Sequence, residues 1–227
     1  MKIDATLECM KWASRDWHDL LVNPGFLRVD SQIAWTNFSR YGHSKPRTPA
    51  DLRVLHETGQ YSFGFRDGSL AQVYYRFDPT ADAVVEASLG FYRLLSAPRP
   101  PSDAEAGGGD LSATDDQVVP PSEDSGLVEW LRVDYDPTAA SPIVHAACHV
   151  HICGLSGARV AINGVPNPRQ FFEFIVATFY PEDYDRKRLG RLGGSARRVV
   201  PGPVNRDLFQ IASAPSEIMH VHLPLSQ

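Results

Sequence analysis

The 227-residue chain is long enough to bury a hydrophobic core, and its 43% hydrophobic and 22% charged residues are ordinary for a soluble globular protein. No apolar run approaches the roughly 20 residues of a membrane span, and the acidic start of the chain excludes a secretion signal, so we expect no membrane partner. The three cysteines form no disulfide framework, which favours a cytoplasmic protein.

The formal net charge of −5 is concentrated in one stretch. Residues 98–126 carry seven acidic residues and one basic residue among Pro, Gly and Ser, so the rest of the chain sums to +1. Such a composition cannot bury enough apolar surface to fold. We therefore expect a flexible acidic insertion at 98–126, placed between two neighbouring strands of a single domain that spans 1–227.

The N-terminal part predicts two helices with extended chain between them. Apolar residues recur at helical spacing over 1–22, and Asn23-Pro24-Gly25 breaks the pattern. Residues 26–40 have an extended pattern. Thr48 followed by Pro49 is typical of a helix start, which predicts a short helix ending near Gly59.

A β-meander follows. Residues 60–66 and 70–77 alternate on either side of an Asp67-Gly68 turn, and 83–95 form a third strand. One face of the first of these strands carries three aromatic residues that we expect in the core: Tyr61, Phe63 and Phe65.

The C-terminal part predicts a strand at 158–162 and a helix at 168–180, which Asn167 caps. A last helix at 203–212 and an H-x-H strand at 218–223 follow. We therefore expect an α+β fold: a single antiparallel sheet of about six or seven strands, with helices packed on one face.

The centre of the chain carries a row of polar side chains. Residues 130–154 hold two carboxylates and three imidazoles on two segments of strand type. Side chains two apart share a face of a strand, so both sets lie on one side of the sheet if the segments pair as antiparallel neighbours. The first row consists of two carboxylates and an arginine: Arg132, Asp134 and Asp136. The second row consists of three imidazoles: His145, His149 and His151.

Three interpretations of this row are open. His149 and His151 can share a divalent metal ion, with Asp134 or His145 as third ligand. Alternatively, two imidazoles can act as acid and base on a phosphodiester, with Arg132 offsetting the developing charge. The third interpretation is structural, with the row making cross-strand hydrogen bonds only.

A second cluster is basic. Residues 186–198 contain six basic residues and no acid, with glycines that favour a flexible loop able to follow a phosphate backbone. A solvated loop without a ligand is the alternative. The six residues are Arg186, Lys187, Arg188, Arg191, Arg197 and Arg198.

Several stretches resemble a known family. D-G-S-L-A-Q-V-Y-Y-R-F-D, A-S-L-G-F-Y, L-R-V-D-Y-D-P, H-A-A-C-H-V-H-I-C-G and N-G-V-P-N-P-R-Q-F-F-E-F-I occur in the order of an uncharacterised bacterial family, domain of unknown function 2290. The resemblance covers about Gln32 to Tyr180. The family has no established activity, so the resemblance implies no reaction. It does imply an association with mobile and defence genes.

A fainter similarity is to small bacterial toxins of the TumE type, which carry R-x-D-N-A-P followed by H-H-x-H. Arg132, Asp134, Pro137, His149 and His151 have a similar order, but the Asn of the toxin pattern and its first imidazole pair are absent. This similarity implies nucleic-acid chemistry or toxin–antitoxin biology.

From these observations we expect a nuclease-like or toxin-like effector that acts on RNA or a nucleotide. Asp134, His149 and His151 would be central to its site, supported by Arg132 and His145. One alternative is a non-enzymatic adaptor or scaffold subunit of a bacterial defence complex. Another is a small-molecule binding domain with a pocket lined by Tyr61, Tyr75 and Trp130.

Overall fold

The computed structural model describes residues 1–39, 46–96, 126–141, 145–152 and 159–191. Within these ranges the chain forms four helices and one nine-stranded sheet whose pairings are antiparallel, which confirms the predicted α+β fold with more strands than expected. The helices are α1 (Ile3–Asp16), α2 (Pro49–Glu57), α3 (Pro168–Phe179) and α4 (Pro181–Arg191). The strands are β1 (Leu21–Val22), β2 (Phe26–Val29), β3 (Gln32–Trp35), β4 (Phe63–Phe65), β5 (Leu70–Phe77), β6 (Val84–Ser96), β7 (Gly126–Tyr135), β8 (Cys148–Ile152) and β9 (Val160–Ala161).

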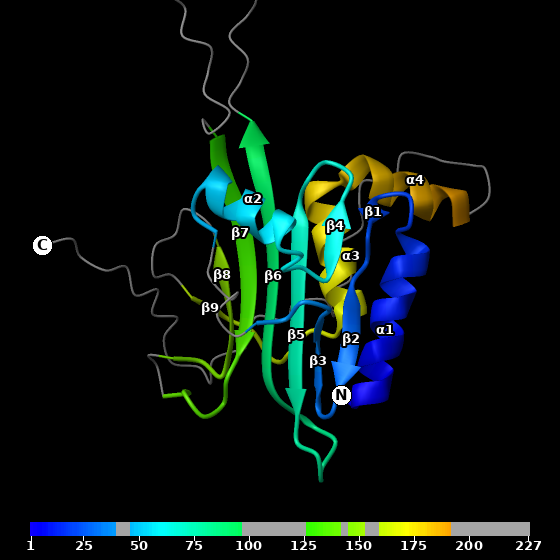
Figure 1. Cartoon of the computed structure of the whole chain (residues 1–227). Coiled ribbons are helices and arrows are strands. Elements are labelled where there is room, and N and C mark those ends of the chain that lie inside the picture. Colours follow the sequence, from blue (N-terminus) through cyan, green and yellow to red (C-terminus); the bar gives the residue numbers. More distant parts are fainter. Residues whose placement is uncertain (40–45, 97–125, 142–144, 153–158, 192–227) are drawn as a thin grey trace, which may run out of the picture.

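The sheet runs in the order β1-β4-β5-β6-β7-β8-β9, and the β2–β3 hairpin joins it through β3 and β5. The long strands β5, β6 and β7 form its centre, as Figure 1 shows. Because β6 and β7 pair directly along ten residues, from Ser96 opposite Gly126 to Ala87 opposite Tyr135, the connection 97–125 joins neighbouring strands, as the sequence predicted. Most of the expected acidic insertion lies outside the described residues; Gly126 is the first residue of β7.

One face of the sheet carries the main core. α3 packs its apolar side against this face, and α1 packs beside α3. Phe172 is fully buried, with its ring centroid 4.4 Å from that of Phe63 on β4. The predicted helix start is confirmed, since the Asn167 side chain accepts a hydrogen bond from the Gln170 amide and Gln170 reciprocates.

The opposite face carries a separate, smaller cluster. Leu52 and Leu55 of α2 pack there against Leu70, Tyr92 and Val128. In Figure 1, α2 crosses in front of β6 and β7 while α3 lies behind the sheet, so the expectation that helices cover one face only is wrong.

The prediction that three aromatic residues at the first strand of the meander share the core is correct for two of them only. Phe63 and Phe65 belong to the main core, as expected, but Tyr61 packs against the α2 cluster. Tyr61 precedes β4, so strand alternation does not fix its face.

One N-terminal prediction needs correction, and a second is confirmed. The helix expected over 1–22 ends at Asp16, and the following turn leads into β1. The extended pattern predicted from residue 26 onward is present as the two strands of the β2–β3 hairpin. Asp30 has φ of +50° at the turn, a conformation that Asp tolerates better than most residues because its short side chain bonds locally.

The expected helix at 203–212 and the H-x-H strand at 218–223 lie outside the described residues. None of the helices in the described ranges is long and apolar enough to cross a membrane.

We predict that Phe172→Ala lowers the free energy of unfolding by about 3–5 kcal/mol, because it leaves a cavity beneath the sheet. Chemical denaturation measures this loss. Val54→Ala, at a side chain that is 55% exposed on α2, is the control and should change stability by less than about 0.5 kcal/mol. Equal effects of the two substitutions would contradict the assignment of the main core.

Candidate active site

The pairing of β7 with β8 brings the two polar rows together. Asp134 lies directly opposite His149, and Arg132 lies opposite His151. Their neighbours Val133, Cys148 and Val150 point to the other face and join the main core. The two rows therefore share the face that carries α2, as predicted for antiparallel neighbours.

Three side chains converge on this face, at the β7–β8 pair. The Nε2 atoms of His149 and His151 are 3.0 Å apart, and Oδ2 of Asp134 is 3.3 Å from Nε2 of His151. One nitrogen or oxygen atom from each of these residues lies within 4.8 Å of the others, a spacing at which the three atoms can share a metal ion. Among the described ranges this is the one such group of His, Cys, Asp or Glu residues.

Asp134 is held by its neighbours. Oδ2 accepts hydrogen bonds from Nη2 and Nε of Arg132, the second at 2.9 Å, and Oδ1 accepts one from Oγ of Ser88 at 3.1 Å. Burial by itself would raise the pKa of the Asp134 carboxyl. The hydrogen bond from His151, together with the charge and hydrogen bonds of Arg132, instead holds this pKa well below its usual range, so the group is a carboxylate at neutral pH.

His149 is fixed in one ring orientation. Its Nδ1 donates to the carbonyl oxygen of Ala146 at 2.9 Å, which leaves Nε2 with a lone pair in the neutral ring. Burial lowers the pKa of His149 below its usual value, because the charged ring would lose its solvation. A neutral imidazole oriented by a backbone carbonyl through its other nitrogen is the usual state of a metal-ligating histidine.

The cluster opens into a pocket of about 360 Å³. α3 lies on the other face, and α2 packs against Val128, six residues or about 20 Å along β7 from Asp134. Neither helix therefore seals the row. The lining residues are Glu86, Ala87, Ser88, Arg132, Asp134, Tyr135, Asp136, His145, His149, His151 and Arg159.

Two further predicted residues line this pocket outside the three-residue cluster. His145 packs edge-on against His149, with ring centroids 4.8 Å apart, and its backbone forms a bridge with Ser141. Asp136 accepts hydrogen bonds from the Thr138 amide and hydroxyl, at 3.0 and 2.6 Å. The bonds to Thr138 lower the pKa of Asp136, and they give this carboxylate a role in ending β7.

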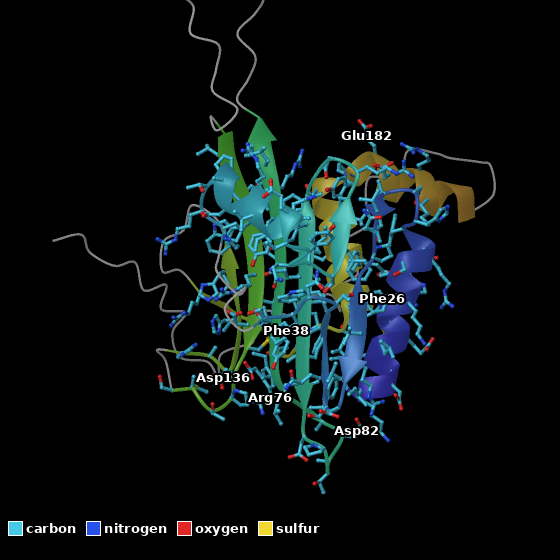
Figure 2. The ribbon with its side chains drawn as sticks, viewed as in Figure 1. Phe26, Phe38, Arg76, Asp82, Asp136 and Glu182 are labelled. Atoms are coloured by element: carbon cyan, nitrogen blue, oxygen red, sulfur yellow. The ribbon has the colours of Figure 1, made fainter. Side chains whose placement is uncertain are left out.

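The basic segment lies elsewhere. Residues 186–191 belong to helix α4 where a flexible loop was expected, so that prediction is wrong for this part. Arg186 pairs with Asp183 at 3.0 Å, and Lys187 lies 4.5 Å over the Trp17 ring. Figure 2 places Glu182 of α4 at the opposite end of the molecule from Asp136. The side chains of Arg188 and Arg191, and all of Arg197 and Arg198, lie outside what the structure describes.

The prediction of a small-molecule pocket lined by three aromatic residues is also wrong. Tyr75 is fully buried in the main core, and its hydroxyl donates to the carbonyl oxygen of Pro166 at 2.6 Å. Tyr61 and Trp130 belong to the cluster on the other face. The sheet therefore separates them from Tyr75.

Sequence reasoning missed Ser88, Glu86 and Arg159 as site residues. Ser88 meets Asp134 across the β6–β7 pair, and the long connection between those strands hides their register from the sequence. Arg159 precedes β9 and joins the pocket only because β9 pairs with β8. The one available signal was the β-meander, which identified β6 as a strand beside the polar segment.

A family model described as an uncharacterized conserved protein, DUF2290, matches residues 28–223, so the chain belongs to this family. The match contains the whole cluster and confirms the resemblance seen in the sequence. No curated protein and no solved structure matches the chain.

We predict that Asp134→Asn destabilises the metal-free protein by about 1–3 kcal/mol at neutral pH, because Arg132 loses a charged acceptor. The carboxyl has a lowered pKa in the folded state, so its contribution is complete above the unfolded value of about 4 and is lost as pH falls further. The stability difference between wild type and variant should therefore be constant above about pH 5 and shrink toward pH 2.

Urea denaturation at several pH values, in a chelating buffer, measures this difference. Asp185→Asn, at an exposed residue of α4, is the matched control. A difference that stays constant down to pH 2 would show that Asp134 is not held as a carboxylate by its neighbours.

Proposed function

We propose that this member of the DUF2290 family is a metal-dependent, nuclease-like hydrolase that cleaves a phosphodiester in RNA or a nucleotide. The observation that carries the proposal is the convergence of two imidazole nitrogens and one carboxylate oxygen within 4.8 Å at the base of a pocket. Two His and one carboxylate leave coordination positions open for water and substrate.

The distances support a metal ion as the occupant of the cluster. Metal–nitrogen bonds of about 2.0–2.1 Å place two ligating nitrogens roughly 2.8–3.4 Å apart, depending on coordination geometry. The observed Nε2 separation of His149 and His151 is 3.0 Å. The bond from His149 to Ala146 orients one ligand, and the bonds from Arg132 and Ser88 orient the carboxylate.

The alternative of metal-free acid–base cleavage fits this geometry less well. It requires each imidazole to reach a different oxygen on opposite sides of the phosphorus, at about 2.6–3.2 Å. His149 and His151 instead contact each other through the nitrogens that would have to reach those oxygens. The two nitrogens are therefore placed to bind one shared atom, such as a metal ion, and not two separate oxygens of a substrate.

In the proposed reaction, the oxygen of a water molecule bonds to phosphorus and the ester P–O bond breaks. The water gives its proton to His145, which lines the pocket outside the cluster, and the departing oxygen takes a proton from solvent. Arg132 offsets negative charge on the phosphoryl oxygens. A divalent ion in the cluster would supply a water of lowered pKa.

A second candidate function is a non-enzymatic adaptor in a defence complex. One observation favours it: Asp134 and His149 already have hydrogen-bond partners within the protein, as a structural seam requires. Leu127, which is 75% exposed at the start of β7, would then contribute to a protein contact. Metal binding distinguishes the two functions, because a structural seam needs no ion.

The role in the cell that fits the hydrolase is a toxin-like effector of a defence or toxin–antitoxin system. The order of Arg132, Asp134, His149 and His151 supports it through the similarity to TumE-type toxins. Nucleic-acid binding by the basic segment 186–198 is part of the same proposal, as a contact distant from the cluster.

We predict that the purified protein binds about one equivalent of Mn²⁺ or Zn²⁺ per chain. His149→Ala or His151→Ala should weaken binding by at least the 10–100-fold that loss of an outer-shell partner costs. Equilibrium dialysis with elemental analysis measures this. His18→Ala, which removes an imidazole in the turn after α1, should bind as wild type does. Absence of metal from the wild type would instead support the adaptor.

We also predict that wild type cleaves single-stranded RNA with added metal and slows bacterial growth when expressed. The double variant His149→Ala/His151→Ala should do neither, because it lacks the nitrogen ligands. Gel analysis of labelled RNA and growth curves are the measurements. His18→Ala is again the control, and circular dichroism checks that the variants fold. Full toxicity and cleavage by a folded double variant would refute the proposed function.

A further inference from the structure

We propose that Arg159 and Arg132 form an anion subsite beside the cluster, which binds the phosphate of one nucleotide unit of the substrate. This inference rests on the proposed function and adds the class of substrate and the residues that recognise it. The site would take a single phosphorylated unit, either a free nucleotide or the end of a single strand, and would exclude a duplex.

The first argument comes from the carboxylates that line the pocket, which are all engaged within the protein. Glu86 pairs with Arg76 at 2.8 Å, and Asp136 is bound by its own turn. Asp134 accepts from Arg132 and Ser88. Glu86 and Asp136 therefore already have partners within the protein, and Asp134 is the carboxylate left to the metal ion of the proposed function.

The second argument comes from the two arginines that line the pocket, which have N–H donors available for a ligand. Arg132 uses Nε and Nη2 on Asp134, so its Nη1 has no hydrogen-bond partner among the residues whose positions are described. Arg159 is exposed, lines the pocket and makes no ion pair within the same ranges. An arginine fork matches the oxygens of a phosphate, and each such charge-assisted bond is stronger than a neutral one.

The third argument is size and position. The pocket volume of about 360 Å³ lies near the lower end of the roughly 300–1,000 Å³ of small-molecule sites. A duplex requires a broad basic surface that follows two backbones. The basic residues of α4 lie at the other end of the molecule, as Figure 2 shows by the separation of Asp136 from Glu182. One nucleotide fits this pocket better than a double helix.

Calorimetric titration of the full chain tests the inference. The nucleotide and the nucleoside are titrated in Mn²⁺ and again after chelation, and the RNA strands after chelation only, because the proposed function predicts their cleavage with metal. The probes are uridine 5′-monophosphate, uridine, a 5′-phosphorylated single-stranded RNA 10-mer, and the same 10-mer in a duplex. The variants are Arg159→Gln and, as control, Arg66→Gln, which removes an exposed arginine from the turn between β4 and β5.

We expect the monophosphate to bind wild type at least tenfold more tightly than uridine. Arg159→Gln should lose about tenfold in affinity for it, since one charge-assisted contact is removed, while Arg66→Gln should not. Metal content should be the same in all three proteins. Tighter binding of the single strand than of the monophosphate, with the gain lost in Arg159→Gln, would identify a strand end as the source of the nucleotide.

Two results would overturn the inference: unchanged monophosphate binding by Arg159→Gln, or preference of the wild type for the duplex. Failure of the proposed function is a different result. A wild type that holds no metal, but still binds the monophosphate in a manner that depends on Arg159, would refute the metal-dependent hydrolase and retain the anion subsite.

Discussion

The antiparallel register of β7 with β8 is the constraint on which the candidate site depends. It sets Asp134 opposite His149 and Arg132 opposite His151. A slip of one residue would turn both imidazoles toward the main core and bring Cys148 and Val150 to the polar face. The burial of those two apolar neighbours therefore fixes the positions of the imidazole nitrogens.

Burial of a polar cluster carries a free-energy cost that its own contacts must offset. His149 and His151 are 2% and 8% exposed, and an uncompensated polar group in such surroundings is strongly unfavourable. The fork from Arg132 and the carbonyl of Ala146 provide compensation. The same contacts hold the cluster in place before any ligand arrives, which is the preorganisation that a metal or catalytic site requires.

The main core and the proposed active site lie on opposite faces of the sheet. α1 and α3 pack on one face and build the main core, whereas the other face carries the small α2 cluster and, farther along β7, the pocket. Because strand residues alternate, each central strand serves both faces with different side chains. Substitutions at Arg159 or His145 therefore act on the pocket without disturbing the aromatic packing around Phe172.

The sequence by itself determined several of the elements and the composition of the polar row. Alternation and turn residues identified β5, β6 and α3, and even spacing placed Asp134 with Arg132 and His149 with His151, because these patterns depend on local backbone geometry. Tertiary structure alone decided that α2 covers the face opposite α3, that 186–191 are helical, and that Ser88 and Arg159 join the pocket. Those facts depend on strand register across the long 97–125 connection and on which apolar faces meet, and neither is encoded in local spacing.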